Sequence, residues 1–458
     1  MSFGPEPPRL SLSVRRGREA PLYSSVRDRP APKAGGSSEG PEAPGSAGAG
    51  AGAPAPRIHR NVVLLGINSL LTDISSESVN AVLPIYLINV LGLSALGFGV
   101  FDGIYQGMSA ILRIVGGTFA DRRQRHKEVA GFGYLLSAVC KLGLLASTTA
   151  GPTAGILFLD RTGKGVRTAP RDALISLSSS PERMGESFGI HRALDTVGAL
   201  IGPILAFALL SVATGAYDSV FVVSFCVAIL GLGVLVFFVQ NPPKERLDVA
   251  RAQALTKHAA RRLLANKAFR RIAVAGAALS LVTISDAFIY LSYQRHTHME
   301  SRFFPLLFVG TALAYLLLAV PLGRLADRIG PAPVFLGGHV VLVGCYLLLR
   351  AAGPGSGFLS VAMILGLLGT YYAATDGVLM ALASAVIPDE LRSSGLAWLT
   401  TVTTAGKLGA SLLFGIVWGL WGPSGAVSCF LIGMVVAIPL AVFVLLLRPS
   451  TRHEVPAP

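Results

Sequence analysis

Charged side chains that could take part in chemistry are concentrated in residues 160–172 of this sequence. The stretch contains four basic and two acidic residues among apolar and small ones. At about 100° per residue, an α-helix would place Arg161 and Asp172 on one face. Asp160 and Lys164 on the adjacent face form an i,i+4 pair of opposite charge. The excess of basic residues favours binding of an anion or an acidic partner helix. The spacing of a nucleotide-binding Walker loop is absent, so nucleotide binding is not indicated.

Other ionisable residues interrupt apolar stretches elsewhere in the chain. In hydrocarbon each one costs several kcal/mol unless it faces a cavity or a partner. Asp73 and Glu77 share one polar face of a predicted helix with Ser69. His191 and Asp195 are spaced for an ion pair or a proton relay within a helix. The residues predicted to form a central charge network, or to carry protons, are Asp73, Glu77, Arg161, Asp172, His191, Arg192, Asp195, Asp286, Asp376 and Lys407.

Proton coupling is the leading interpretation of these charges. Burial raises the pKa of a carboxylate and a nearby cation lowers it. A conformational change that moves the cation would therefore switch the carboxylate between its protonated and ionised forms. Asp73 and Arg161 are the preferred pair, because each lies on a polar face in the first half of the chain. The alternative is a charge cluster that only locks three helices together.

Catalytic residues, metal ligands and cofactors are not expected. The spacing of His191 and Asp195 also occurs in acyl-transfer enzymes, but one such match inside an apolar helix is weak support. The four cysteines are far apart, each in an apolar run, and no Cys-x-x-Cys spacing occurs. A zinc site, a redox pair and a disulfide framework are therefore poor interpretations.

The composition indicates the environment in which these charges act. Only 14% of the 458 residues are charged, against about 25% in a soluble domain. Apolar residues make up 52%, the mean hydropathy is +0.60, and the formal net charge is +14. This composition excludes a wholly disordered protein and argues against nucleic-acid binding. It indicates a membrane protein whose basic loops lie on one side.

Apolar stretches of about 20 residues recur from residue 61 onward, and each is long enough to cross a hydrocarbon core of about 30 Å. Backbone groups in lipid must hydrogen-bond within their own segment, so the stretches are predicted to be helices and the fold class to be an all-α polytopic membrane protein. The twelve predicted spans are residues 61–90, 95–120, 128–149, 154–177, 186–212, 217–240, 270–294, 303–326, 332–350, 356–386, 394–420 and 424–447.

Basic residues in the loops predict the orientation of the spans. They are concentrated after the second and sixth spans, and the alternate loops carry almost none. The positive-inside rule places both termini and the central linker in the cytosol, in a multi-pass protein of the plasma membrane. The first residues, rich in Pro, Gly, Ala and Ser, are predicted to be disordered. The predicted organisation is a disordered cytosolic tail over 1–57, a six-helix bundle over 58–240, a cytosolic linker over 241–269, a second six-helix bundle over 270–448 and a cytosolic tail over 449–458.

Two motifs occur twice, at nearly the same offset. The copies of the first motif are Gly117-x-x-x-Asp121-Arg122 and Gly323-x-x-x-Asp327-Arg328. The copies of the second begin at Asp172 and at Asp376. Two motifs in register indicate two pseudo-symmetric six-helix halves. Parallel repeats of this kind place a binding site near the membrane midplane, between the halves.

The first motif, extended to Arg125, resembles the loop motif of the major facilitator superfamily. Arg161 followed by Gly165 resembles the arginine motif of that superfamily's fourth helix. A third set, called the helix-5 motif below, resembles the motif of its antiporters and consists of Gly198, Gly202 and Pro203. The resemblance covers residues 58–448. It implies a bacterial transporter of a drug- or solute-efflux-like branch, which alternates access by rocking its halves.

The resemblance also implies a gating role for the loop motif. Asp121 would lie against the N-terminus of the helix that starts near Gly395, where the partial positive charge of the helix favours a carboxylate. Arg122 and Arg125 would pair with acidic residues. Such contacts would exist only while the cytosolic side is closed, and would bias the outward-facing state. The alternative is that these basic residues only set the topology.

A secondary active transporter is the function that these observations favour. The main hypothesis is a proton-coupled exporter of drug-like or amphiphilic solutes. The runner-up is a proton-coupled importer of an organic anion drawn to the arginines of residues 160–172. A non-transporting receptor or scaffold would not need buried charges in both halves, and a polytopic enzyme would need a nucleophile and a base. The expected partners are a small-molecule substrate, the proton and the lipid bilayer, with no nucleic acid, and the chain is expected to act as a monomer.

Overall fold

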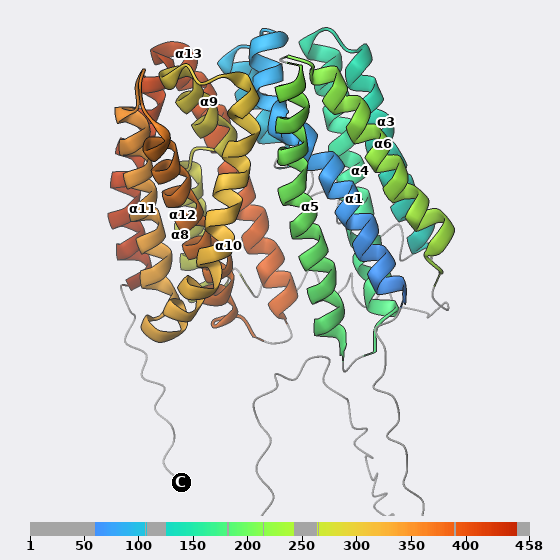
Figure 1. The fold of residues 1–458 in the computed structure, drawn as a ribbon. Helices are drawn as coiled ribbons and strands as arrows, with labels where there is room; N and C mark the ends of the chain where they lie inside the picture. Colours follow the sequence, from blue (N-terminus) through green and yellow to red (C-terminus); the bar gives the residue numbers. More distant parts are fainter. Residues whose placement is uncertain are drawn as a thin grey trace, which may run out of the picture. The chain divides into compact units, whose positions relative to one another are not determined.

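The computed structural model describes helices and the short connections between them (Figure 1). The described residues are 60–105, 107, 125–180, 183–213, 215–241, 263, 265–388 and 391–446. All of them belong to one unit, Pro56–Pro458. The predicted tails, most of the predicted linker, and Gly117, Asp121 and Arg122 of the loop motif lie outside the described residues.

Every regular element in the described part of the chain is helical, which confirms the all-α fold class. The first elements are α1 (Arg60–Ile85), which continues as the π-helix η1 (Tyr86–Val90), a short helix Ala95–Tyr105, α3 (His126–Ala146), α4 (Ala150–Leu177), α5 (Met184–Val212) and α6 (Tyr217–Phe238). The later elements are α8 (Lys267–Leu281), α9 (Asp286–Thr297), the 3-10 turn η3 (Ser301–Phe303), α10 (Phe304–Ile329), α11 (Pro331–Ala351), α12 (Phe358–Ser384) and α13 (Arg392–Leu446).

Nine helical segments within the described residues are long and apolar enough to cross a membrane. One of them, α13, contains the last two predicted spans, separated by a break at Gly422. The φ angle of this glycine is 71°, a value that glycine adopts readily because it has no Cβ. The charged run of residues 160–172 accounts for the absence of α4 from this apolar set.

The predicted span over 270–294 is wrong in one respect, because the chain leaves the helical path at residues 282–285. The residues after α8 are Val-Thr-Ile, and three consecutive β-branched residues lose side-chain freedom in a helix. The amide of Ile284 donates to the Tyr346 hydroxyl at 2.8 Å, which replaces a lost helical hydrogen bond. The span is therefore two half-helices, and the second half begins with Asp286.

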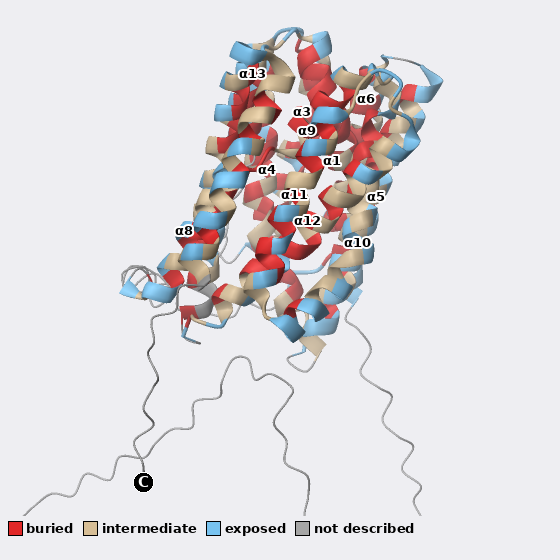
Figure 2. Ribbon diagram, turned by 90° about the vertical axis from the view of Figure 1, so that its left-hand side faces the viewer, coloured by how far each residue is buried: buried red, intermediate tan, exposed pale blue. Residues whose placement is uncertain are grey.

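Helix packing leaves an apolar exterior. α1 lies against α5 and α6, α3 against α4, α12 against α10 and α11, and α8 against α13. Figure 2 shows buried residues where helices face one another and exposed residues on their outer surfaces. Large apolar side chains are among the exposed ones, such as Phe237 (81% exposed) and Phe358 (85% exposed). A surface of this kind suits contact with lipid rather than with water.

Candidate functional site

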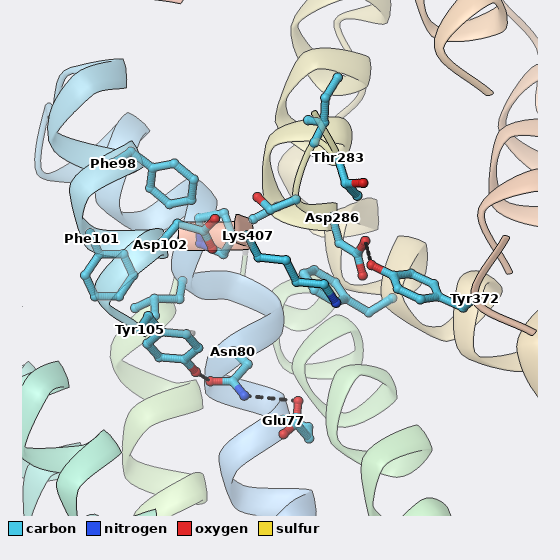
Figure 3. Close-up of a pocket in the computed structure, with 16 residues that line it drawn as sticks. Glu77, Asn80, Phe98, Phe101, Asp102, Tyr105, Thr283, Asp286, Tyr372 and Lys407 are labelled. Atoms are coloured by element: carbon cyan, nitrogen blue, oxygen red, sulfur yellow. Dashed lines mark hydrogen bonds between the residues drawn. The ribbon is translucent and has the colours of Figure 1, made fainter. Parts of the chain in front are cut away.

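A cavity of about 320 Å³ lies where α1, the helix Ala95–Tyr105, the α8–α9 break, α12 and α13 converge (Figure 3). Cavities of about 300–1,000 Å³ are typical of small-molecule sites. The ionisable residues that line it are Glu77, Asp102, Asp286 and Lys407. The aromatic residues that line it are Phe98, Phe101, Tyr105, Phe308 and Tyr372. The cavity therefore combines charged groups and aromatic walls contributed by segments far apart in the sequence.

The break between α8 and α9 places Asp286 in the cavity wall. The Tyr372 hydroxyl on α12 donates to Oδ1 of Asp286 at 2.6 Å. The ammonium of Lys407 on α13 lies 6.0 Å from the centre of the same tyrosine ring. In the described part of the chain, no carboxylate lies within 4.0 Å of this ammonium. An acid and a base thus approach one tyrosine without forming an ion pair with each other.

Glu77 is held on the α1 side of the cavity by polar neighbours. Asn80 donates through Nδ2 to Oε2 of Glu77 at 3.0 Å and accepts a hydrogen bond from the Tyr105 hydroxyl (Figure 3). The ammonium of Lys164 on α4 lies 3.3 Å from Oε1 of Glu77. The predicted pair of Lys164 with Asp160 is therefore wrong, because Lys164 is directed at α1.

Arg161 belongs to a buried cluster behind Tyr105. Its Nη2 lies 2.7 Å from Oδ2 of Asp160, and Nζ of Lys141 on α3 lies 3.6 Å from Oδ1 of the same carboxylate. The guanidinium also lies 4.0 Å from the centre of the Tyr105 ring. Arg161 therefore has its own counterion and reaches the cavity through an aromatic wall residue. The role of Lys141 was not predicted, although a lone lysine in an apolar span was a signal for it.

Asp73 lies in a different cluster, formed by α1, α4 and α5. Its carboxyl group lies beside that of Asp195. Arg171 lies 3.8 Å from Asp195 and 2.9 Å from Asp172. The structure thus brings together three of the predicted acids, and Arg171 rather than Arg161 is the guanidinium beside Asp172 and Asp195.

The other predicted members of the charge network are more dispersed. His191 is buried, and no ion pair within 4.0 Å joins it to Asp195 among the described residues. Arg192 reaches Asp195 at 3.9 Å with its side chain 82% exposed. Asp376 is exposed on α12. Across the described ranges, no group of three or more His, Cys, Asp or Glu side chains forms a candidate metal site.

The described residues of the loop motif do not line the cavity. Arg125 is exposed and precedes α3. The second copy lies in α10, where Asp327 and Arg328 are exposed near the end of the helix and Gly323 lies one turn earlier. The gating role of the motif stays a prediction, since most of the first copy is outside the described residues.

The helix-5 motif packs α5 against α1. A Cβ added at Gly198 or Gly202 would lie 2.6 or 2.8 Å from a backbone carbonyl oxygen of α1. Helices approach this closely only where the side chain is absent. Pro203, the third residue of the motif, is buried. The same two glycines face the β-carbons of Asp73 and Glu77, so the motif presses α5 onto the acidic face of α1.

Asp102 is a cavity residue that the sequence analysis missed. It is 7% exposed and accepts a 2.7 Å hydrogen bond from the Ser411 hydroxyl on α13. The signal for it was a single acid within the predicted span 95–120. Beside this bond the two helices touch, because a Cβ at Gly99 would lie 3.1 Å from the Cα of Gly415. These contacts join the helix Ala95–Tyr105 directly to α13.

An apolar exterior, a discontinuous helix and a charged central cavity together define a multi-pass membrane transporter. The comparisons with known proteins identify the family. The model of the Major Facilitator Superfamily matches residues 65–297 and 272–458. This chain belongs to the Major Facilitator Superfamily.

The relatives in sequence include a transporter of the same type. An uncharacterized MFS-type transporter of Methanocaldococcus jannaschii is 30% identical over 393 residues, which cover 83% of this chain and 93% of that protein. An uncharacterized protein of Mycobacterium tuberculosis is 32% identical over 164 residues, which cover 36% of this chain and 40% of that protein.

Solved transporter structures share the fold at low identity. A nucleoside transporter matches with a TM-score of 0.74 and 14% identity, over 84% of this chain and 100% of that one. A POT family transporter in complex with 5-aminolevulinic acid matches with a TM-score of 0.67 and 16% identity, over 85% of this chain and 96% of that one.

Proposed function

We propose that this chain is a proton-coupled exporter that moves drug-like or amphiphilic solutes across the plasma membrane by alternating access. The observation that carries the proposal is the central cavity, where charged residues of α1 and the helix Ala95–Tyr105 meet those of α9 and α13. A site built between two halves changes the side from which it is reached when the halves rock against each other.

The carboxyl pair of Asp73 and Asp195 is the proposed proton site. Two neighbouring carboxyl groups favour a proton on one of them, because two like charges close together repel each other. The Arg171 guanidinium, 3.8 Å from Asp195, is the cation whose approach would favour release of that proton. The second proposed element is Arg161, which contacts the cavity wall through Tyr105.

The proposed direction is export. The helix-5 motif resembles that of antiporters, and it packs α5 onto the acidic face of α1. The basic loops favour an orientation with both termini in the cytosol. The alternative is import of an organic anion. It is favoured by Lys407, whose ammonium faces the cavity with no carboxylate within 4.0 Å in the described part of the chain.

Energised membrane vesicles that contain the full chain test the proposal. Inverted and right-side-out vesicles are offered ethidium, a cation, ciprofloxacin, a zwitterion, and fluorescein, an anion. An exporter accumulates its probe in inverted vesicles and loses it when a protonophore collapses the gradient. Accumulation only in right-side-out vesicles would support the importer. Accumulation that survives the protonophore would reject proton coupling, and vesicles without the protein are the control.

Gly415→Val is expected to push α13 away from the helix Ala95–Tyr105. The added Cβ would lie 2.7 Å from the backbone carbonyl oxygen of Ala95, which cannot rotate away. Because alternating access requires the two helices to part, the variant should populate the separated conformation. Spin labels are attached at Leu96→Cys and Leu420→Cys in a cysteine-free background. Double electron–electron resonance should give longer distances between them in Gly415→Val than in the parent protein.

Gly419→Val is the matched control for this prediction. It lies one turn further along α13, where an added Cβ meets no atom within 4 Å. The control should keep the distance distribution of the parent protein. Identical distributions in the two variants would contradict the prediction.

A further inference from the structure

We propose that the cavity binds an amphiphilic organic zwitterion, a small molecule with an aromatic body between an anionic group and an ammonium group. The inference rests on the transporter function proposed above and specifies the substrate class of the same cavity. Its basis is the placement of one base and one acid around a single tyrosine.

Lys407 is the group that selects an anion. Its ammonium faces the cavity, and its contact is the ring of Tyr372 at 6.0 Å from the ring centre. That distance is at the outer limit of a cation–π contact. No carboxylate lies within 4.0 Å of the ammonium among the described residues. Asp376 and Asp286 act on this ammonium only from beyond that distance. A cation withdrawn from water is stabilised by a direct counterion, and the anionic group of a ligand can supply it.

Asp286 is the group that selects an ammonium. Its Oδ1 accepts a hydrogen bond from the neutral Tyr372 hydroxyl at 2.6 Å. No basic side chain lies within 4.0 Å of its carboxylate in the ranges that the structure describes. Glu77 differs, because Lys164 lies 3.3 Å from it. Asp286 can therefore receive the cationic group of a ligand, whereas the charge of Glu77 is already balanced.

The separation of the two groups argues for one ligand with two charges. Lys407 and Asp286 are more than 4.0 Å apart, and Tyr372 contacts both. The two groups act on each other only at this longer range. An anion would give Lys407 a direct partner and leave Asp286 without one, and a cation would do the reverse. A zwitterion that spans the tyrosine satisfies both at once.

The walls and the size of the cavity set the rest of the molecule. Phe98, Phe101 and Tyr105 join Tyr372 around it (Figure 3). Phe308 also lines the cavity. Aromatic walls favour a flat apolar body, which can pack in stacked or edge-to-face arrangements. The volume of about 320 Å³ is at the lower end of small-molecule sites, so the body has one or two rings.

Three probes built on the same para-substituted benzene ring test the proposal. They are 4-(aminomethyl)benzoate, a zwitterion, 4-methylbenzoate, an anion, and 4-methylbenzylamine, a cation. Their dissociation constants are measured by ligand-observed NMR with the full chain in lipid nanodiscs. We expect the zwitterion to bind roughly tenfold more tightly than either singly charged probe, because it makes one more charge-assisted contact.

Two variants assign each charge of the probe to its partner. Lys407→Gln should remove the advantage of the zwitterion over the amine, and Asp286→Asn should remove its advantage over the benzoate. Lys267→Gln and Asp218→Asn change exposed residues and should preserve the order of the parent protein. The proposal is overturned by equal affinities in the parent, by a singly charged probe that binds most tightly, by no binding at millimolar concentration, or by an unchanged order in both cavity variants.

Binding in nanodiscs needs no proton gradient and no direction of transport. A chain that binds the zwitterion selectively but fails in energised vesicles would retain this inference and lose the exporter proposal. A chain that exports ethidium but shows no preference for the zwitterion would retain the exporter proposal and lose this inference.

Discussion

Asp73→Asn is expected to abolish proton-driven transport and to preserve exchange of substrate across the membrane. The Asp73 carboxyl group lies beside that of Asp195. An amide keeps a hydrogen-bond donor in this position but cannot release a proton in the physiological range. Accumulation driven by a pH gradient should therefore fall to the level of vesicles without protein. Exchange of labelled for unlabelled probe, which needs no gradient, should continue.

The same assay includes one further variant and one control. Arg161→Ala removes the guanidinium that lies 4.0 Å from the Tyr105 ring centre and should also lose gradient-driven accumulation. Asp218→Asn changes an exposed acid at the start of α6 and should behave as the parent. Amounts in the membrane are matched for all variants. Undiminished coupled transport in both Asp73→Asn and Arg161→Ala would reject this assignment of the coupling residues.

Gly163→Val is expected to destabilise the whole helical unit. Its Cβ would lie 2.7 Å from the carbonyl oxygen of Gly133 and 3.0 Å from the backbone nitrogen of Ser137. Both contacts are backbone atoms, so α3 and α4 would have to separate. That movement breaks the hydrogen bond from the Ser137 hydroxyl to the Asp160 carbonyl oxygen and strains the buried pair of Lys141 with Asp160. We expect the free energy of unfolding to fall by about 4 kcal/mol.

Gly155→Val is the matched substitution on the same helix. An added Cβ there meets no atom within 4 Å, while the change in helix propensity is the same. Thermal unfolding of the two purified variants is monitored by size-exclusion chromatography. The difference between them separates the effect of helix packing from the effect of helix propensity. If Gly163→Val and Gly155→Val unfold at the same temperature, the α3–α4 contact tolerates a side chain and the prediction is wrong.

The helices and the family could be predicted because both depend on local features of the sequence. A run of about 20 apolar residues has few alternatives to a membrane-spanning helix, and the family motifs are short strings of adjacent residues. The break in the span 270–294 was missed because the apolar pattern continues through it. The interruption depends on a partner from another helix, because the Tyr346 hydroxyl on α11 satisfies the Ile284 amide.

The charged residues were predicted more fully than their partners. Helical spacing placed Asp73 and Glu77 on one polar face, and in the structure this face meets other charged side chains. Helical spacing did not indicate that Lys164 would pair with Glu77 rather than with Asp160. The partner of Lys164 depends on how α4 is rotated about its axis relative to α1. The spacing of residues within one helix does not determine that rotation.

The sequence alone determined that this is an all-α membrane protein of the major facilitator superfamily. It also identified the charged residues that must avoid lipid. Both follow from length, hydropathy and motifs, which are properties of contiguous segments. The tertiary structure was needed to show which charges share a cavity. Asp102 and Ser411 are 309 positions apart and joined by a 2.7 Å bond, and Lys407 and Asp286 approach the same tyrosine from different helices. Such contacts depend on how helices cross and where one of them breaks, and those features are set by packing among all of the helices at once.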